Sequence, residues 1–207
     1  MRSAALVISE CQQGILGDAT SVTPGLARQA AERGIVARIA GLAEAFRAAA
    51  LPVVHCHIEH RADLAGIRPN SLPAALTIKH RRMIAGTADT LPPPELAPRP
   101  EDHVSRRAVG LTAFYGTDLD ATLRLRGVDT IVLTGVSTDV AIPGFALEAA
   151  NRGYYVRIPA DCVAGTSAGA HEFMMSGLLP AVSRITGSAA VRREISALMG
   201  TSERDGR

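Results

Sequence analysis

The chain has 207 residues, of which 47% are hydrophobic and 20% charged, and this composition is typical of a folded protein and not of a disordered one. Its net charge of +2 is too small to favour nucleic acid or a membrane surface as a partner, and no apolar run approaches the ~20 residues of a membrane span. The three cysteines are odd in number and far apart, and the first apolar run is typical of a strand and not of a signal peptide, so we expect a cytoplasmic protein with reduced thiols.

Short apolar runs rich in β-branched residues alternate with helical patterns along the chain. The runs predict strands buried on both faces, and they are AALVIS (4–9), LPVVHCHI (51–58), TIVLTGV (130–136) and YYVRIPA (154–160). Apolar spacing and terminal glycines predict helices over 27–49, 116–127, 139–152, 168–181 and 188–199. Strands that alternate with helices predict an α/β fold with a parallel sheet covered on both faces.

Two segments interrupt this alternation. Residues 16–25 form a polar loop directly after the first strand, and residues 61–103 contain most of the prolines. A loop as long as 61–103 is usually functional in a compact domain, so we expect a lid or an assembly surface; the alternative is a surface excursion without a role.

In a parallel α/β sheet, ligands bind beyond the carboxyl ends of the strands, near the point where the strand order reverses. Four places in the sequence meet this condition, and each carries polar residues. They are Glu10 and Gln12 after the first strand, Glu59 and His60 after the second, 137–141 after the run 130–136, and Asp161 with Cys162 after the last.

Two stretches resemble the isochorismatase-like (cysteine hydrolase) family. The more specific one is LTAFYGTDLDATLRLRGVDTIVLTGVSTDVAIPGFALEAANRGYYVRIPADCVAG (111–165), and ISECQ (8–12) is similar to the family's first-strand motif. The resemblance covers roughly residues 4–187. It implies a Rossmann-like, doubly wound, mainly parallel six-stranded sheet with helices on both faces, in a single domain over 1–207.

The amidase branch of this family uses an Asp, a Lys and a Cys, and the chain departs from it at each position. The thiolate attacks a carbonyl, the carboxylate moves protons, and the lysine lowers the pKa of both. Carried over residue by residue, the Asp position is Glu10, the Lys position is Ala108, and the Cys position is Ala141. The only lysine of the chain, Lys79, lies in the proline-rich segment.

Glu10 is the candidate catalytic residue, because a carboxylate beyond a buried strand can act as an acid or base if its surroundings raise its pKa. The alternative is a structural glutamate paired with an arginine. Arg107 precedes the Lys position, and a one-residue bulge would bring it into the pocket, where it would bind a carboxylate. Otherwise Arg107 is a solvated charge on an edge strand, and it cannot move protons in either place.

The resemblance further implies a cis peptide bond between Val136 and Ser137, with backbone amides near Ser137 and Ala141 that bind an oxyanion or a carboxylate. The full set of substrate-binding candidates is Gln12, His60, Arg107, Phe114, Val136, Ser137, Val140 and Ala141.

Other cysteines and histidines supply the remaining candidates. Cys162 lies on the correct rim of the sheet for a relocated nucleophile, although a buried structural cysteine is the commoner case. His55, His57 and His60 lie near the position where nicotinamidases of the family bind metal with an Asp and histidines, but Ile58 replaces the Asp. We therefore expect neither a metal nor another cofactor.

Three functions follow as alternatives. The first is a small-molecule hydrolase that works without a covalent cysteine, as the vinyl-ether-cleaving isochorismatases do, with Glu10 as acid and with a carboxylate as a candidate substrate group. The second is an inactive family member that binds a ligand or a partner through the old active site. The third is an amidase that uses Cys162. In each case we expect a homo-oligomer, as the family commonly forms, and we expect neither nucleic acid nor membrane as a partner.

Overall fold

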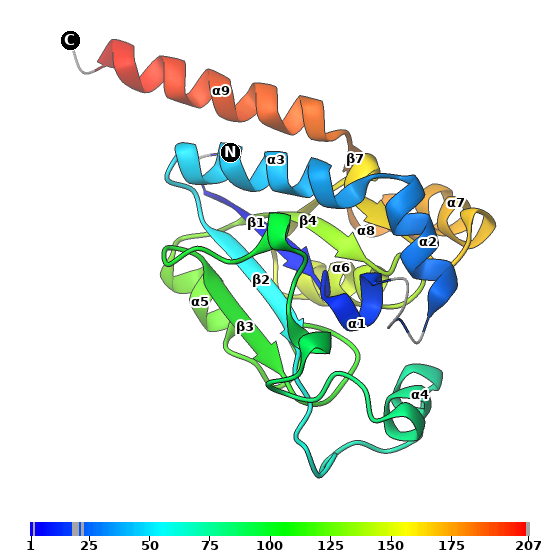
Figure 1. The fold of residues 1–207 in the computed structure, drawn as a ribbon. Helices are drawn as coiled ribbons and strands as arrows, with labels where there is room; N and C mark the ends of the chain where they lie inside the picture. Colours follow the sequence, from blue (N-terminus) through cyan, green and yellow to red (C-terminus); the bar gives the residue numbers. More distant parts are fainter. Residues whose placement is uncertain (2, 18–20, 22, 206–207) are drawn as a thin grey trace.

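The computed structural model describes residues 1, 3–17, 21 and 23–205, and it describes side chains as far as residue 200. Its centre is a parallel sheet with the strand order β3-β2-β1-β4-β5-β7 (Figure 1). The strands are β1 (Ala4–Ser9), β2 (Val53–Ile58), β3 (His103–Arg107), β4 (Thr130–Val136), β5 (Tyr155–Pro159) and β7 (Arg184–Thr186). The predicted doubly wound parallel sheet is therefore confirmed. It has one more strand than expected, because β6 (Val163–Ala164) pairs with the end of β4.

The strand order reverses beside β1. The chain first moves outward from β1 to β2 and β3, and it then returns to the other side of β1 to build β4, β5 and β7. Ser9, at the end of β1, is level with Cys56 in β2 and with Gly135 in β4. The carboxyl ends of these strands therefore meet at the place where doubly wound sheets bind ligands.

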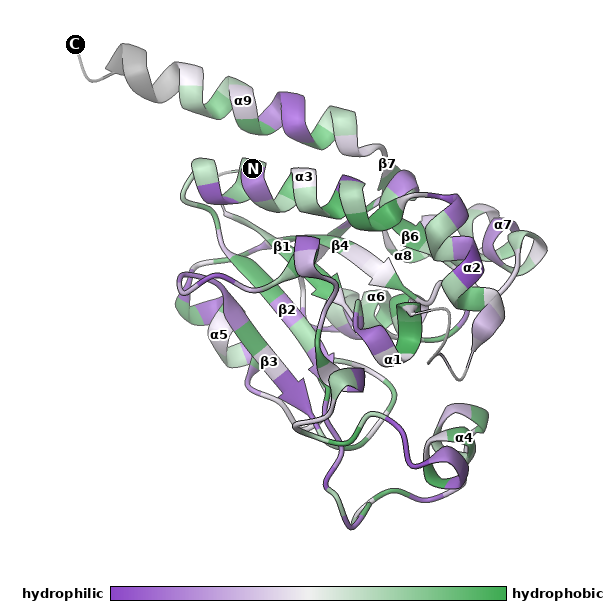
Figure 2. Cartoon of the chain, in the orientation of Figure 1, coloured by the Kyte–Doolittle hydropathy of each residue, from purple (hydrophilic) through white to green (hydrophobic). Residues whose placement is uncertain are grey.

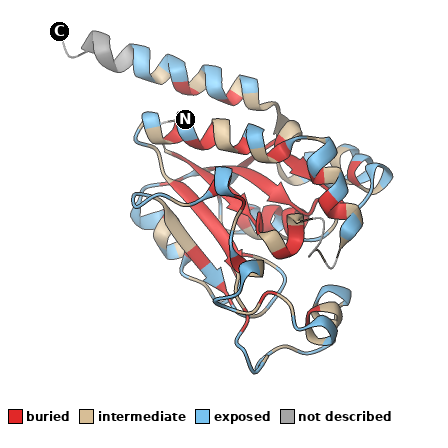
Figure 3. Cartoon of the chain, viewed as in Figure 1, coloured by how far each residue is buried: buried red, intermediate tan, exposed pale blue. Residues whose placement is uncertain are grey.

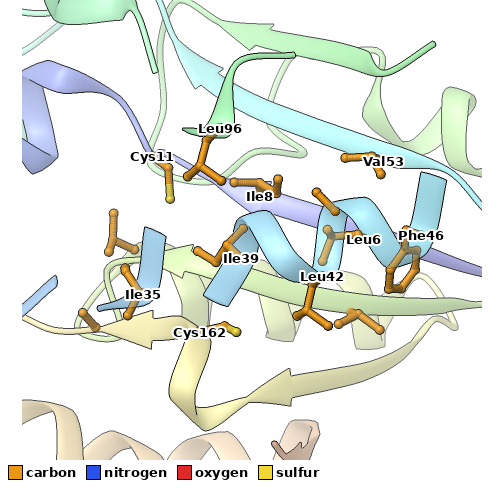
Figure 4. Packing of buried hydrophobic residues seen from close by; sticks show 14 of the residues in the cluster. Leu6, Ile8, Cys11, Ile35, Ile39, Leu42, Phe46, Val53, Leu96 and Cys162 are labelled. Atoms are coloured by element: carbon orange, nitrogen blue, oxygen red, sulfur yellow. The ribbon is translucent and has the colours of Figure 1, made fainter. Parts of the chain in front are cut away.

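Alternate side chains of β1 enter two separate hydrophobic cores. Leu6 and Ile8 pack on the face covered by α3 (Ile35–Ala48) and α9 (Ser188–Asp205), as Figure 4 shows for the α3 side. Ala5 and Val7 pack on the opposite face, under α5 (Leu119–Leu125) and α6 (Ala141–Asn151). The central strands β1 and β4 are accordingly apolar and buried, whereas the edge strand β3 is largely hydrophilic and the outer faces of the helices are exposed (Figures 2 and 3).

Two predicted helices are each broken in two by a glycine. The helix expected over 27–49 is α2 (Pro24–Glu32) followed by α3, because Gly34 adopts a left-handed conformation with φ 60°. The helix expected over 168–181 is α7 (Ala168–Ser176) followed by α8 (Leu178–Val182), with Gly177 between them. In both cases the apolar spacing continues through the break, so the pattern alone predicts one helix.

The proline-rich segment is partly built into the protein body. It contains α4 (Leu72–His80) and the short turns η1 (Ala88–Thr90) and η2 (Pro94–Leu96). Leu96 is buried in the same core as α3, whereas α4 stands apart from the sheet (Figure 1). The expected polar loop 16–25 lies partly outside the described residues; its described part begins with the last residue of α1 (Gln13–Leu16) and ends in α2. Among the described helices, none has the length and apolar character to cross a membrane.

Candidate active site

Glu10 is the first residue after β1, at the point where the strand order reverses. Its backbone has φ 55°, an uncommon left-handed value for a non-glycine residue, and its N–H donates to the Cys56 carbonyl at 2.9 Å. The side chain is buried, with only 11% of its surface exposed. Because buried carboxylates need a partner, the position of the nearest cation decides how this one is held.

That partner is Arg107, the last residue of β3. Its Nη2 donates to Glu10 Oε1 at 2.7 Å, and its Nε donates to the Gly110 carbonyl at 3.3 Å. No bulge is needed, because the β2–β3 pairing continues in register as far as Ile58 and Arg107. Alternation along β3 turns Arg107 inward, while Arg106 points outward and pairs with Glu59.

The pair leaves two polar atoms without partners among the described residues. Arg107 Nη1 is buried and has no hydrogen bond. Glu10 Oε2 has none either, since the only side-chain bond of Glu10 is made by Oε1. Burial raises the pKa of Glu10, and the Arg107 charge and hydrogen bond oppose this rise. The site therefore offers a free donor beside a carboxyl group whose proton is held more tightly than usual.

His60 lies beside this pair and is fixed by the chain on both sides. Its Nδ1 lies 2.7 Å from the Ala108 carbonyl, so Nδ1 carries the proton and Nε2 is an acceptor. Its backbone exchanges hydrogen bonds with Met83 and Ala85 of the proline-rich segment. Burial lowers the pKa of His60, an effect to which the Arg107 charge adds, and the hydrogen bond to Ala108 opposes it. His60 is thus a neutral ring.

The turn after β4 brings its backbone to the same edge of the sheet. The peptide bond between Val136 and Ser137 is cis. The Ser137 carbonyl accepts from the amides of Val140 and Ile142, so the Ala141 N–H, at the first position of α6, has no backbone acceptor among the described residues. Unpaired amides at a helix start favour anions.

A close approach of β1 and β4 supports this turn. Gly135 has φ 100°, and a Cβ atom on it would lie 2.1 Å from the Ser9 carbonyl oxygen. Only glycine lets the two strands come this near. The nucleophile position that follows is Ala141, whose methyl group is 4% exposed and has no chemistry of its own.

Two of the predicted substrate-binding residues hold the structure together. Gln12 Nε2 donates to the carbonyls of Ile58 and Thr90, and Oε1 accepts from the Ile58 N–H at 2.8 Å, so its amide joins the end of β2 to the proline-rich segment. Phe114 lies in the core beneath α6, with its ring centroid 4.7 Å from that of Phe145. Both side chains make contacts within the protein, which the sequence pattern did not indicate.

The two valines of the turn lie differently. Val136 is fully buried in the core that faces α3, whereas Val140, the residue before α6, is 40% exposed. Only Val140 is therefore open to a ligand.

All three cysteines of the chain are buried. Cys162 is fully buried in the core, and burial raises its pKa to about 12. Burial raises the pKa of Cys56 to about 12 as well, and that of Cys11 still further. A thiol with such a pKa is not ionised near neutral pH, so the burial of Cys162 does not favour the alternative of an amidase that uses it.

His55 and His57 lie on β2, and their carboxylate partners are Asp102 and Glu59 and not Glu10. His55 Nε2 is 3.3 Å from Asp102 Oδ2, and Asp102 also accepts two bonds from Arg47. Burial lowers the pKa of His57 to about 4, with smaller contributions from the neighbouring charges. Among the described residues, no group of three His, Cys, Asp or Glu side chains has metal-binding geometry.

One contact that anchors the turn cannot be predicted from the sequence pattern. Thr138 is fully buried; its N–H donates to the Ala164 carbonyl at 2.9 Å, and its Oγ1 lies 3.2 Å from His171 Nδ1 on α7. Only the fold brings these residues together, because 33 positions separate Thr138 from His171.

Comparison with known proteins agrees with this architecture. The family model described as the isochorismatase domain matches residues 4–190. The chain belongs to the isochorismatase family. Isochorismatase family protein YecD of Escherichia coli O157:H7 is 32% identical over 89% of this chain and 92% of its own length.

Two further relatives widen the comparison. Maleamate amidohydrolase of Pseudomonas putida is 29% identical over 83% of this chain and 76% of its own. A solved isochorismatase family protein from Desulfovibrio vulgaris has a TM-score of 0.81 and 26% identity, covering 95% of this chain and all of that one. The resemblance found in the sequence is thereby confirmed.

Proposed function

We propose that this isochorismatase family member hydrolyses a small molecule that carries a carboxylate, and that it works without a covalent cysteine. The observation that carries the proposal is the buried pair of Glu10 and Arg107, in which Arg107 Nη1 and Glu10 Oε2 have no partners among the described residues. A purely structural ion pair is normally satisfied on both sides, because an unpartnered buried donor costs free energy.

In this proposal Arg107 binds the substrate. A guanidinium group stays charged and presents parallel N–H groups that match a carboxylate. Nη1 would take one carboxylate oxygen, and the Ala141 N–H at the start of α6 would support the anion from the other side. Val140, which is partly exposed, and Ser137 complete this wall of the site.

Glu10 would supply the acid. Burial raises its pKa, so a larger fraction of its carboxyl groups keeps the proton near neutral pH. On a vinyl ether, Glu10 would give its proton to the vinyl carbon, and water would add to the resulting cation and return a proton to Glu10. The C–O bond of the hemiketal then breaks to release an alcohol and a ketone such as pyruvate.

An inactive ligand-binding protein is the second candidate. It is favoured by the replacement of the family's lysine and cysteine positions by Ala108 and Ala141, since Arg107 cannot move a proton. In this case Arg107 still binds the carboxylate of a ligand, and only turnover is lost.

The proline-rich segment forms one wall of this site in our proposal. His60 exchanges backbone bonds with Met83 and Ala85, so a movement of α4 would pull on the residue beside Arg107. This connection favours a lid over an assembly surface.

We also infer a homo-oligomer, because Leu72 and Phe173 are large apolar residues that are each 72–73% exposed. Light scattering would measure the mass of the assembly.

Incubation with isochorismate, followed by measurement of pyruvate, tests the proposed reaction, and maleamate with ammonia detection extends the test to amides. We expect turnover that Glu10→Gln lowers by a factor of at least ~100. The control is Glu59→Gln at the same edge of the sheet, which removes a partly exposed pair with Arg106 and a 4.0 Å contact with His57. If neither compound is turned over but the protein binds them through Arg107, the inactive alternative is correct.

A further inference from the structure

An open cavity at the protein surface, with a volume of about 440 Å³, lies beside α7. Its walls come from the end of α2, from the residue after β5, from α7 and from β7, and not from the strand ends that carry Glu10 and Arg107. Met175 and Ile185 give it an apolar side, and Arg33, His171 and Glu172 give it a polar side. A pocket of this size with a few converging polar groups is typical of a small-ligand site.

Arg33 is the cation of this cavity, and it has no counter-ion within the described part of the chain. Its Nε is buried and lacks a hydrogen-bond partner, and its guanidinium group takes part in no ion pair with the described residues. The neighbouring Arg38, by contrast, lies 3.8 Å from Asp161. A partly buried arginine without a partner is costly unless a ligand satisfies it.

His171 adds a second polar group without adding charge. It is buried, and its Nδ1 lies 3.2 Å from Thr138 Oγ1, which leaves the other ring nitrogen for the cavity. Burial lowers its pKa, and the Arg33 charge lowers it further, against the opposing charges of Asp139 and Glu172. The ring is therefore neutral, and in the tautomer in which Nδ1 accepts from the Thr138 hydroxyl, Nε2 carries the proton and is a donor.

We propose that this cavity binds a small monocarboxylate with an apolar body. The carboxylate pairs with the guanidinium of Arg33 and accepts from His171, and the apolar body packs against Met175 and Ile185. Glu172 opposes a second negative charge, so dicarboxylates are excluded. A ligand held this way contacts a ring bonded to Thr138, next to the turn that begins at Ser137, so it can influence the candidate active site.

Titration of the whole protein with 4-methylpentanoate, followed by the methionine methyl signals in NMR, tests this proposal. We expect a saturable shift of the Met175 methyl with a dissociation constant on the order of 1 mM, as suits a ligand of few atoms. The alcohol 4-methylpentan-1-ol, of the same shape without the charge, and adipate, with two charges, should each bind at least roughly tenfold more weakly.

Two variants decide where the ligand lies. Arg33→Gln should weaken binding by roughly tenfold or more, whereas Arg38→Gln, a nearby exposed arginine, should not. Equal binding of the alcohol, or unchanged affinity in Arg33→Gln, would each overturn the proposal. The comparison of acid with alcohol uses the unmodified chain, so it does not depend on a variant that folds.

Discussion

Replacement of Arg107 by Met should destabilise the fold, and the loss should grow with pH. The substitution removes the only ion pair of Glu10 within the described chain and leaves a buried carboxyl group without its cation. Breaking a buried pair by removal of one partner costs about 3–5 kcal/mol, provided that the remaining group stays charged. The lost Arg107 Nε bond to the Gly110 carbonyl adds about 1 kcal/mol that does not depend on pH.

The pH-dependent part follows from the pKa of Glu10, whose ordinary value is 4.5 and which burial raises. A folded-state pKa above the unfolded value means that the associated stability is present at pH below the unfolded value and is lost as the pH rises through the folded value. Arg107→Met removes the group that lowers this pKa, so the folded value rises further. Between pH 5 and pH 8 the deficit of the variant should grow by at most ~1.4 kcal/mol per pH unit.

Urea unfolding at pH 5, 6.5 and 8 measures this deficit, with the wild type, both single variants and the double variant Glu10→Gln/Arg107→Met. Glu10→Gln removes the titrating group, so the double variant should recover most of the loss at pH 8 and show the same deficit at every pH. If the deficit of Arg107→Met is independent of pH, or if the two substitutions are additive, Glu10 and Arg107 do not form a coupled buried pair and the reasoning fails.

Further predictions concern the frame of the site. Gly135→Ala should lower the free energy of unfolding in urea by more than ~3 kcal/mol, because its Cβ would collide with the Ser9 carbonyl. Gly153→Ala is the control, also at positive φ but with open space around it, and it should lower this free energy by about 1 kcal/mol. Equal losses in the two variants would refute the close approach of the strands. Gln12→Ala should lower the free energy of unfolding by about 2–3 kcal/mol, because it removes three hydrogen bonds of the Gln12 amide. A much smaller loss would show that these bonds are not formed. The native chain should resist iodoacetamide in mass spectrometry until unfolded, and rapid labelling of Cys162 would contradict its burial.

The sequence predicts the position of the site better than its details. Polar residues after apolar runs correctly indicate the edge of the sheet at which Glu10 and the turn after Val136 meet, because parallel strands end at the same edge. The sequence does not show whether Arg107 faces the site or the solvent, because this depends on the phase of β3. The short strand has two adjacent arginines at its end, and only its register with β2 shows which one faces the core.

Contacts between distant segments account for most of what the sequence does not reveal. The amide of Gln12 is polar and lies after the first strand, so it resembles a substrate-binding group, but the Thr90 carbonyl that it bonds lies 78 positions away. The breaks of the helices at Gly34 and Gly177 are also not visible in the apolar pattern. Apolar spacing records which side chains face the core, and it does not record a change in the direction of the helix axis.

The contact between Arg107 and Glu10 also limits the chemistry that this site can perform. A lysine beside a carboxylate can share its proton, whereas a guanidinium keeps its own at any accessible pH. All proton movement in the pair therefore belongs to Glu10, and Arg107 sets only how tightly that proton is held. With Ala141 in the nucleophile position and the three cysteines buried, the function that we propose forms no covalent acyl intermediate. In that proposal one carboxyl group protonates a substrate or activates water, and a vinyl ether or another acid-labile bond suits this requirement better than an amide.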